Sequence, residues 1–399
     1  MGVKKFLGGT VHRYYLFSLF KDCAFFTAVL VPFFTEWGGI SLFQVQILQS
    51  WFMFWLFVLE VPTGAIADKF GRKHSMTLGG VIVTVAVLVY ASIPSFAVFL
   101  LAEFLFAVAM ALISGADSAL LYDALKENGA EDQSKKIFGR AHSFHLLGML
   151  IAGPVGSLIA SQFGLRAPTL ASAIPFLLAA GVAWNIPEPK RSDATSQSPN
   201  YMKTVQVGLS FLRHHRFARF LTLNAILVSG ATYYVIWFYQ PILTQLAIPI
   251  LYFGWIHAIL VSSEILVANN FVHLERLFGS EKRYLRFSAL ITSVSFLLVS
   301  LFPNIVTLGM FILFAGGFGL TRIEYITVLL QKDIPSDQRA TVLSSISMFR
   351  RLALFVINPI VGLLATRSLS LALALVGLLP LLTFLLPKIT FPSLEAKTR

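Results

Sequence analysis

The ten residues Gly64-Ala-Ile-Ala-Asp68-Lys69-Phe-Gly71-Arg72-Lys73 connect two long apolar stretches of the chain. Gly64 allows two helices to pack closely, and Gly71 permits a tight turn in a short connection. The acid and the bases of this segment form a charge cluster that can pair with neighbouring helix ends and separate when the structure opens. The segment therefore predicts a charged connection at the cytoplasmic surface of a membrane, between two spanning helices.

The composition of the chain is that of a membrane protein. Of the 399 residues, 56% are hydrophobic and 13% are charged, whereas soluble domains have about 25% charged residues. We therefore expect neither a water-soluble enzyme nor an intrinsically disordered chain. The net charge of +12 does not indicate a nucleic-acid partner, because basic residues in such a chain hold loops on the cytoplasmic side of the bilayer. The single cysteine, Cys23, excludes an internal disulfide and a cysteine-based metal cluster.

Apolar stretches of the length of a spanning helix, about 20 residues, recur along the whole sequence. We expect helices, because the alternating pattern of barrel strands is absent. The twelve expected spans are residues 13–34, 42–66, 75–93, 96–122, 138–161, 167–187, 217–240, 249–272, 284–302, 305–330, 340–365 and 369–387. Most of the 31 Lys and Arg residues lie in the termini and the even-numbered connections, which predicts that both termini are cytoplasmic.

The longest polar stretch divides these spans into six and six. It runs from Glu188 to about Asn200, contains proline, serine and charge, and has no apolar period, as is typical of a linker. The amphipathic piece that follows is expected to lie on the membrane surface. We therefore expect two six-helix bundles, residues 1–187 and 213–399, joined by a cytoplasmic linker at 188–212.

The two halves resemble a weak repeat. A shift of 208 residues aligns Gly71 with Gly279 but places Asp22 opposite Gly230, so the ionisable residues are not repeated. A duplicated scaffold with asymmetric charges favours a transporter whose site lies between two half-bundles.

The connecting segment Gly64–Lys73 matches every defined position of G-x-x-x-D-[RK]-x-G-R-[RK], a signature of the major facilitator superfamily. The sequence as a whole resembles that superfamily. Ser114–Asp123, reading SGADSALLYD, looks like a segment of a bacterial branch with many multidrug-like members, and Arg339–Ser344 is similar to the superfamily's R-[GA]-T-x-x-S. The resemblance implies the major facilitator fold and a secondary transporter, of the multidrug-efflux type, that works by alternating access.

Two places differ from the patterns of drug exporters. Gly153-Pro154-Val-Gly156 is similar to the antiporter signature G-P-x-x-G-G but lacks one spacer residue. Many exporters of the superfamily carry an arginine early in the fourth span, where this chain has Glu103. The arginine-based scheme of proton coupling therefore does not carry over to this chain.

Carboxylates inside the predicted spans are the candidates for proton coupling, because a charge in the membrane costs free energy unless it is paired or hydrated. Asp22 lies near the middle of the first span and is the first choice as proton carrier; a fixed ion pair with an arginine of another helix is the alternative. Glu103, near the periplasmic end of its span, is the second candidate. Glu264 is the third, and it could share a proton with His257 two turns earlier.

The candidates for substrate binding are polar and aromatic residues within the spans. Arg322 would bind an anionic substrate or neutralise Asp22. An aromatic cavity with few charges suits a bulky amphipathic or cationic molecule. The full set is Arg322, Glu324, Tyr233, Trp237, Trp55 and His257.

A third set of residues is expected to form a cytoplasmic gate around the connecting segment. Asp123, at the cytoplasmic end of the fourth span, is expected to join Arg72 or Arg140 there, and Arg339 opens the eleventh span. The set comprises Gly64, Asp68, Gly71, Arg72, Lys73, Asp123, Arg140 and Arg339. His142 and His145 share a helix face but have no third ligand at suitable spacing, so we expect no metal site.

The sequence has no phosphate-binding loop, nucleophile elbow or zinc helix motif, so we expect no enzyme and no cofactor. We expect proton-coupled export of small organic, drug-like or amphipathic molecules by a monomer in the inner (plasma) membrane, with the proton and the lipid bilayer as its other partners. The alternatives are uptake or exchange of a small anionic metabolite, with Arg322 as the clamp, and a lipid-linked flippase.

Overall fold

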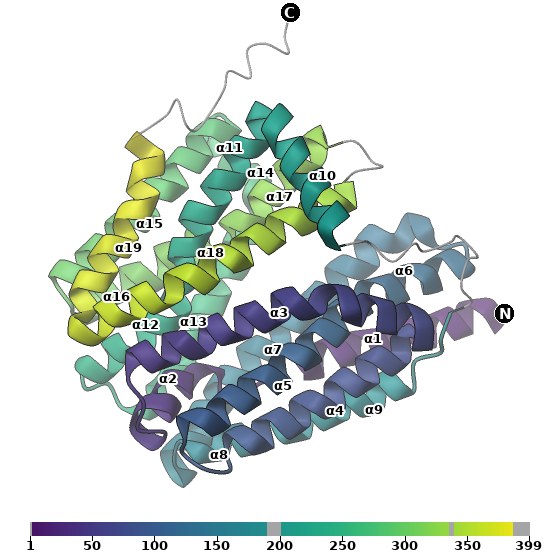
Figure 1. Ribbon diagram of the computed structural model, residues 1–399, viewed down its shortest axis with the longest axis horizontal. Helices are drawn as coiled ribbons and strands as arrows, with labels where there is room; N and C mark the ends of the chain where they lie inside the picture. The colour runs from purple at the N-terminus through teal and green to yellow at the C-terminus, as the bar shows by residue number, and fades with distance from the viewer. Residues whose placement is uncertain (1, 190–200, 335–338, 386–399) are drawn as a thin grey trace, which may run out of the picture. The chain divides into compact units, whose positions relative to one another are not determined.

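The computed structural model describes residues 2–189, 201–334 and 339–385, and every regular element within these ranges is helical (Figure 1). In this part of the chain, ten helices are long and apolar enough to cross a membrane. An all-α membrane protein was expected, and the described elements have this character. The number of twelve spans and the cytoplasmic location of the termini stay predictions.

The chain divides into two compact units. Unit 1 comprises Met1–Ile40, Leu48–Pro199 and Pro249–Ala258, and unit 2 comprises Ser41–Ile47, Asn200–Ile248 and Ile259–Arg399. The expected boundaries at 187 and 213 stay a prediction, and most of the expected linker, residues 190–200, lies outside the described residues.

The helices of unit 1 begin with α1 and end with α9. Their bounds are α1 Gly2–Lys21, α2 Leu30–Pro32, α3 Leu42–Phe70, α4 Arg72–Tyr90, α5 Phe96–Ser114, α6 Asp117–Glu127, α7 Ser134–Phe163, α8 Arg166–Ala171 and α9 Ala173–Trp184. The first residues of α3 belong to unit 2. In this unit α4 packs along both α5 and α9 (Figure 1).

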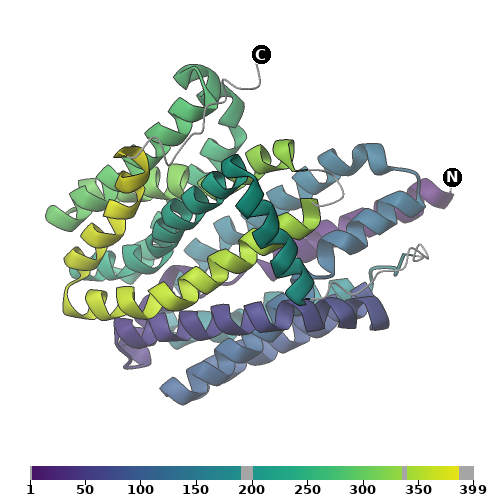
Figure 2. The ribbon, with the colours of Figure 1, turned by 45° about the horizontal axis from the view of Figure 1, so that its top comes forward.

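The helices of unit 2 begin with α10, and the first residues of α13 belong to unit 1. Their bounds are α10 Tyr201–His214, α11 Arg216–Asn224, α12 Gly230–Gln245, α13 Ile250–Asn269, α14 Phe271–Phe278, α15 Glu281–Leu301, α16 Ile305–Met310, α17 Arg322–Asp333, α18 Arg339–Arg367 and α19 Leu369–Leu385. Two π-helical stretches, η4 Ala225–Ser229 and η5 Phe311–Leu320, continue α11 and α16. Here α15 packs against α19 and η5, and α10 lies across α18 (Figure 2).

The first expected span, residues 13–34, is not one continuous helix. Helix α1 ends at Lys21, and the chain then forms a 3₁₀ turn at Thr27–Val29, the short α2 and a π-helical stretch at Phe33–Trp37. The break falls where two charged residues, Lys21 and Asp22, follow an apolar helix. Asp22 therefore lies at a helix end and not in the middle of a straight span.

The end of α1 lies very close to α7. A methyl group on Gly148 would overlap the carbonyl oxygen of Leu19, and one on Gly156 would overlap that of Phe25. Only glycine allows the backbones to approach this closely. This packing brings the residues after Lys21 next to the face of α7 that carries His145.

Candidate functional site

Four ionisable side chains meet at the break after α1. Lys21 Nζ lies 2.9 Å from Asp117 Oδ2 at the start of α6. His145 Nδ1, on α7, lies 2.6 Å from Asp22 Oδ2. Because the helix ends at Lys21, these two neighbouring residues reach different helices, and each finds a partner of the opposite kind. A fixed pair between Asp22 and an arginine was the alternative considered from sequence; the structure gives Asp22 a histidine partner.

The cluster remains partly open to solvent. The exposed fractions of the side chains are 18% for Asp22 and 33% for His145, and 21% and 12% for Lys21 and Asp117. Lys21 and Asp117 balance each other's charge, whereas His145 balances Asp22 only when it is protonated. Both side chains are partly exposed, although Asp22 Oδ2, the oxygen in the contact, is itself buried.

His142 extends this group along α7. Its ring stacks on that of His145, with the centroids 5.4 Å apart. In the described part of the chain, no group of three or more His, Cys, Asp or Glu side chains is placed to hold a metal ion. Of the two histidines, His145 is the one in contact with an acid, Asp22.

Glu103 lies buried on α5, with 5% of its surface exposed. Gln49 Nε2 donates a hydrogen bond of 2.8 Å to Glu103 Oε1, and Tyr90 also hydrogen-bonds the carboxyl group. Trp55 lies on α3, and its ring is 4.7 Å from that of Phe104, the residue after Glu103. The structure thus places Glu103 among neutral polar groups.

Arg322, at the start of α17, is fully buried with 1% of its surface exposed. Its guanidinium donates from Nε and Nη2 to Asn224 Oδ1, at 3.1 and 2.8 Å, and from Nη1 to the Leu285 carbonyl at 2.6 Å and to Ser288 Oγ. Four of the five N–H groups that an arginine carries are therefore engaged. Arg322 ties α17 to α11 and α15, and among the described residues no carboxylate forms an ion pair with it. This arrangement leaves little of the guanidinium for a substrate.

The other candidates of unit 2 are spread over α12, α13 and α17. Tyr233 and Trp237 are neighbours on α12, with ring centroids 6.2 Å apart. Glu264 is half-buried on α13, and the exposed Glu324 on α17 is near enough to act on it electrostatically. Asn358 was not predicted from the sequence. Its Oδ1 accepts a 2.7 Å hydrogen bond from the buried Tyr234 hydroxyl. The sequence pattern that could have indicated it is an asparagine within an apolar helix.

His257 belongs to unit 1 and is buried, with 5% of its surface exposed. It lies two turns before Glu264 on α13, about 10 Å along the helix axis. Its ring lies against Gly153 of α7, since a methyl group there would be 3.0 Å from His257 Cδ2. That His257 and Glu264 could share a proton stays a prediction, which this spacing does not favour.

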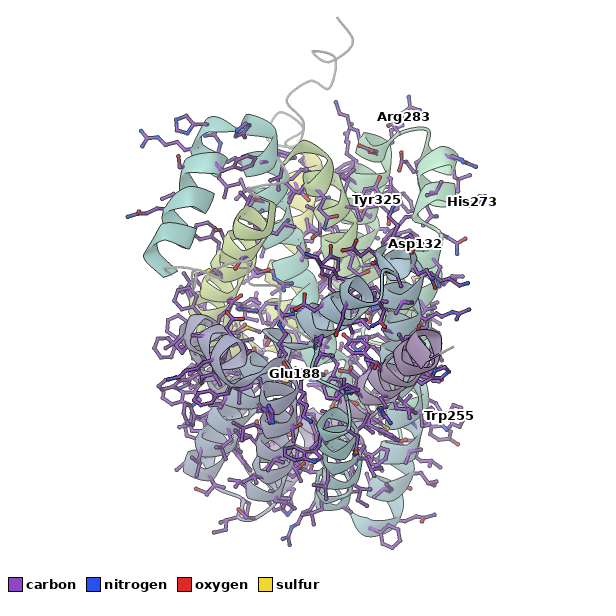
Figure 3. The ribbon with its side chains drawn as sticks, turned by 90° about the vertical axis from the view of Figure 1, so that its right-hand side faces the viewer. Asp132, Glu188, Trp255, His273, Arg283 and Tyr325 are labelled. Atoms are coloured by element: carbon purple, nitrogen blue, oxygen red, sulfur yellow. The ribbon has the colours of Figure 1, made fainter. Side chains whose placement is uncertain are left out.

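The charged connection between α3 and α4 is held by two acids. Arg72 Nη1 pairs with Asp123 Oδ2 of α6 and donates 2.6 Å to the Ala119 carbonyl. The carboxylate of Glu188, labelled in Figure 3, accepts from the backbone N–H groups of Arg72 and Lys73, at 2.7 and 2.8 Å. The first N–H groups of a helix have no acceptor within the helix. The carboxylate supplies one at the N-terminus of α4, where the helix dipole also favours a negative charge. Glu188 had been assigned to the linker, and its role could not be read from the sequence because it lies 116 residues from Arg72.

The remaining gate residues surround this connection. Gly71 has a φ of 107°, a conformation that favours glycine. Asp68 is half-buried, Lys69 is exposed, and the exposed Arg140 hydrogen-bonds Tyr15. Gly64 packs near Gly115. Arg339 begins α18, and its side chain lies outside the described residues.

The long apolar helices and the charged connection define a multi-pass helical membrane protein. The family model of the Major Facilitator Superfamily matches residues 16–358, so the chain belongs to that family. It is therefore a secondary transporter that moves small molecules across a membrane. No curated protein matches the sequence.

Solved structures of transporters share this fold. A mutant of the nucleoside transporter NupG has a TM-score of 0.82 at 13% identity, with 96% of this chain and 100% of that chain covered. A bacterial homologue of the human lysosomal transporter Spinster has a TM-score of 0.75 at 15% identity, covering 98% and 99%. The POT family transporter PepTSo has a TM-score of 0.71 at 12% identity, covering 96% and 97%. At these identities the likeness shows the fold.

Proposed function

We propose that this transporter couples the movement of protons to the export of small organic molecules, and that the pair Asp22–His145 carries the proton. The observation behind the proposal is the 2.6 Å contact between an acid and a histidine, both partly open to solvent, beside a balanced pair of charges. An imidazole exists in a neutral and a protonated form, so the pair can differ in charge between two states of a transport cycle.

The proton changes the electrostatic attraction between Asp22 and His145. With His145 protonated, the pair is neutral overall and its two partners attract each other; after the proton leaves, Asp22 is an uncompensated negative charge inside the protein. Such a charge has to be hydrated or paired. Loss of the proton thus favours an arrangement that gives water access to Asp22, and rebinding favours closure. This is how a proton gradient would drive alternating access.

Buried tryptophans, one in each unit, are the basis for proposing a bulky, amphipathic substrate. Trp55 on α3 and Trp237 on α12 each bury an indole N–H that has no hydrogen-bond partner in the structure. Buried indoles of this kind offer both an apolar surface and a donor to an organic molecule. The structural relatives include a nucleoside transporter and, at 17% identity and a TM-score of 0.62, a human organic anion transporter.

Uptake of an anion clamped by Arg322 is the weaker alternative, because neutral oxygens already occupy most of the guanidinium donors. We further propose that the protein acts as a monomer in the inner (plasma) membrane, with six helices on each side of the linker and both termini in the cytoplasm. We also propose that the chain carries no enzymatic activity.

Proton release from inside-out vesicles tests the proposal. Vesicles that contain the protein and are acidified inside should leak protons when a transported dye, antibiotic or organic anion is added. In Asp22→Asn and His145→Gln this leak should fall to the level of vesicles without the protein. Asp132→Asn, which changes an exposed acid between α6 and α7, is the matched control and should keep it (Figure 3). A substrate-dependent leak of wild-type size in both site variants would refute the role of the pair.

A further inference from the structure

A groove opens beside α10 and α11 in unit 2, separate from the charged cluster of unit 1. Its volume is about 470 Å³. The residues that line it come from α10, α11, η4 and α18: Leu209, Leu212, Arg213, Arg219, Thr222, Leu223, Ile226 and Phe349. Helix α10 packs on α18 at this place (Figure 2).

One end of the groove is positively charged. Arg213 and Arg219 are both exposed, and Arg219 Nη1 donates to the Arg213 carbonyl at 3.5 Å, which holds the second guanidinium beside the first arginine. No Asp or Glu occurs in α10, α11, η4 or α18, the four elements that line the groove. The arginines therefore have no acid partner on the helices that line the groove, and an anion would complement their charge.

A buried hydroxyl lies next to this charged end. Thr222 lines the groove with only 4% of its surface exposed. Its Oγ1 is buried and has no hydrogen-bond partner in the structure. Because a buried polar group without a partner costs free energy, such a hydroxyl indicates a ligand that can bond it.

The other end of the groove is apolar. Leu223, Ile226 and Phe349 line it, and two of them follow Arg219 on the same stretch of helix. Ile226 lies seven residues after Arg219, about 10 Å deeper along the axis. Arg219 is near the start of a helix long enough to cross the membrane, Ala218–Gln245, so the groove runs from the membrane surface towards the hydrocarbon core. Its polarity is that of a lipid, with a charged head and an apolar tail.

We propose that this groove binds an anionic phospholipid of the leaflet next to α10, with the phosphate against Arg213 and Arg219 and an acyl chain along Leu223, Ile226 and Phe349. The site is independent of the proton pair in unit 1. It anchors α10 and the start of α11 to the bilayer, so that the junction between the linker and unit 2 is held at the membrane surface by a specific lipid.

Lipid titration of the purified full-length protein tests the site. Phosphatidylglycerol or phosphatidylcholine is added to the protein in detergent, and bound lipid is counted by native mass spectrometry. Wild-type protein should bind one phosphatidylglycerol more tightly than phosphatidylcholine. The double variant Arg213→Gln/Arg219→Gln should bind phosphatidylglycerol about 30-fold more weakly, because each basic residue near an anionic surface contributes about a factor of five.

Two further variants separate the site from general charge and from misfolding. Arg276→Gln/Arg283→Gln removes the same charge from exposed residues at another place in unit 2 (Figure 3 labels Arg283) and should bind as wild type does. Leu223→Trp fills the apolar end and should weaken phosphatidylglycerol binding with both arginines present. Equal weakening in the two double variants, or unchanged binding in Arg213→Gln/Arg219→Gln, would overturn the proposal. Competition by inorganic phosphate as effective as that by phosphatidylglycerol would show a phosphate site and overturn the assignment to a lipid.

Discussion

The contact between Glu188 and the start of α4 should protect two backbone amides from hydrogen exchange, and this protection can be measured for each residue. Replacing Glu188 with alanine removes the acceptor of two backbone N–H groups, those of Arg72 and Lys73. A hydrogen bond to a charged group contributes about 1.5–3 kcal/mol, and a negative charge at a helix N-terminus adds about 0.3–1 kcal/mol. Glu188 is only half-buried, so we take about 2 kcal/mol for the whole contact.

This free energy corresponds to about a 30-fold change in a local opening equilibrium. Hydrogen–deuterium exchange of the purified protein, read at the first residues of α4, should therefore accelerate about 30-fold at Arg72 and Lys73 in Glu188→Ala. Glu188→Gln keeps one acceptor oxygen and should give a smaller increase. Asp132→Ala, a change in an exposed acid of another connection, should leave both amides unaffected. Exchange at wild-type rates in Glu188→Ala would refute the reasoning.

Three further predictions concern buried contacts. Gly254→Ala should destabilise the protein by about 1–3 kcal/mol, because its methyl group would overlap the Gly153 carbonyl of α7, whereas Gly181→Ala enters open space; equal melting temperatures of the two variants would contradict this packing. Arg322→Lys should cost about 3 kcal/mol, since an ammonium cannot make all the hydrogen bonds of the planar guanidinium and leaves buried oxygens unpaired, and a chemical denaturation midpoint close to that of the wild type would argue against it. Glu103→Leu should be less stable than Glu103→Gln by about 1–3 kcal/mol, because only the amide still accepts the Gln49 hydrogen bond; thermal unfolding of both variants measures the difference.

Much of the scaffold could be predicted from local patterns. The apolar stretches predicted the helices that are long enough to cross a membrane, and the connecting segment with its defined glycines, acid and bases indicated the family to which the chain belongs. The weak repeat was informative as well, because Gly71 and Gly279, aligned by a shift of 208 residues, both adopt a positive φ. The apolar composition of a span and the glycine of a turn each depend on a few neighbouring residues, so both can be predicted from the local sequence.

The first span shows where this reasoning ends. Its average hydrophobicity predicts one helix over 13–34, but α1 ends at Lys21. The cost of placing Lys21 and Asp22 in an apolar setting is lowered when they reach partners on α6 and α7. Whether such partners exist depends on residues about 100 positions away, which no local pattern contains.

The sequence by itself determined that this protein is helical, lies in a membrane and carries the signature of a transporter family, because membrane insertion depends on the composition of each stretch. Only the tertiary structure decided which charge meets which. It paired Asp22 with His145 and Lys21 with Asp117, placed Glu188 on the N-terminus of α4, and surrounded Arg322 with neutral oxygens. The physical reason is that a buried charge is stabilised by whichever donor or acceptor the packed helices bring within about 3 Å, and that proximity arises from packing between distant segments.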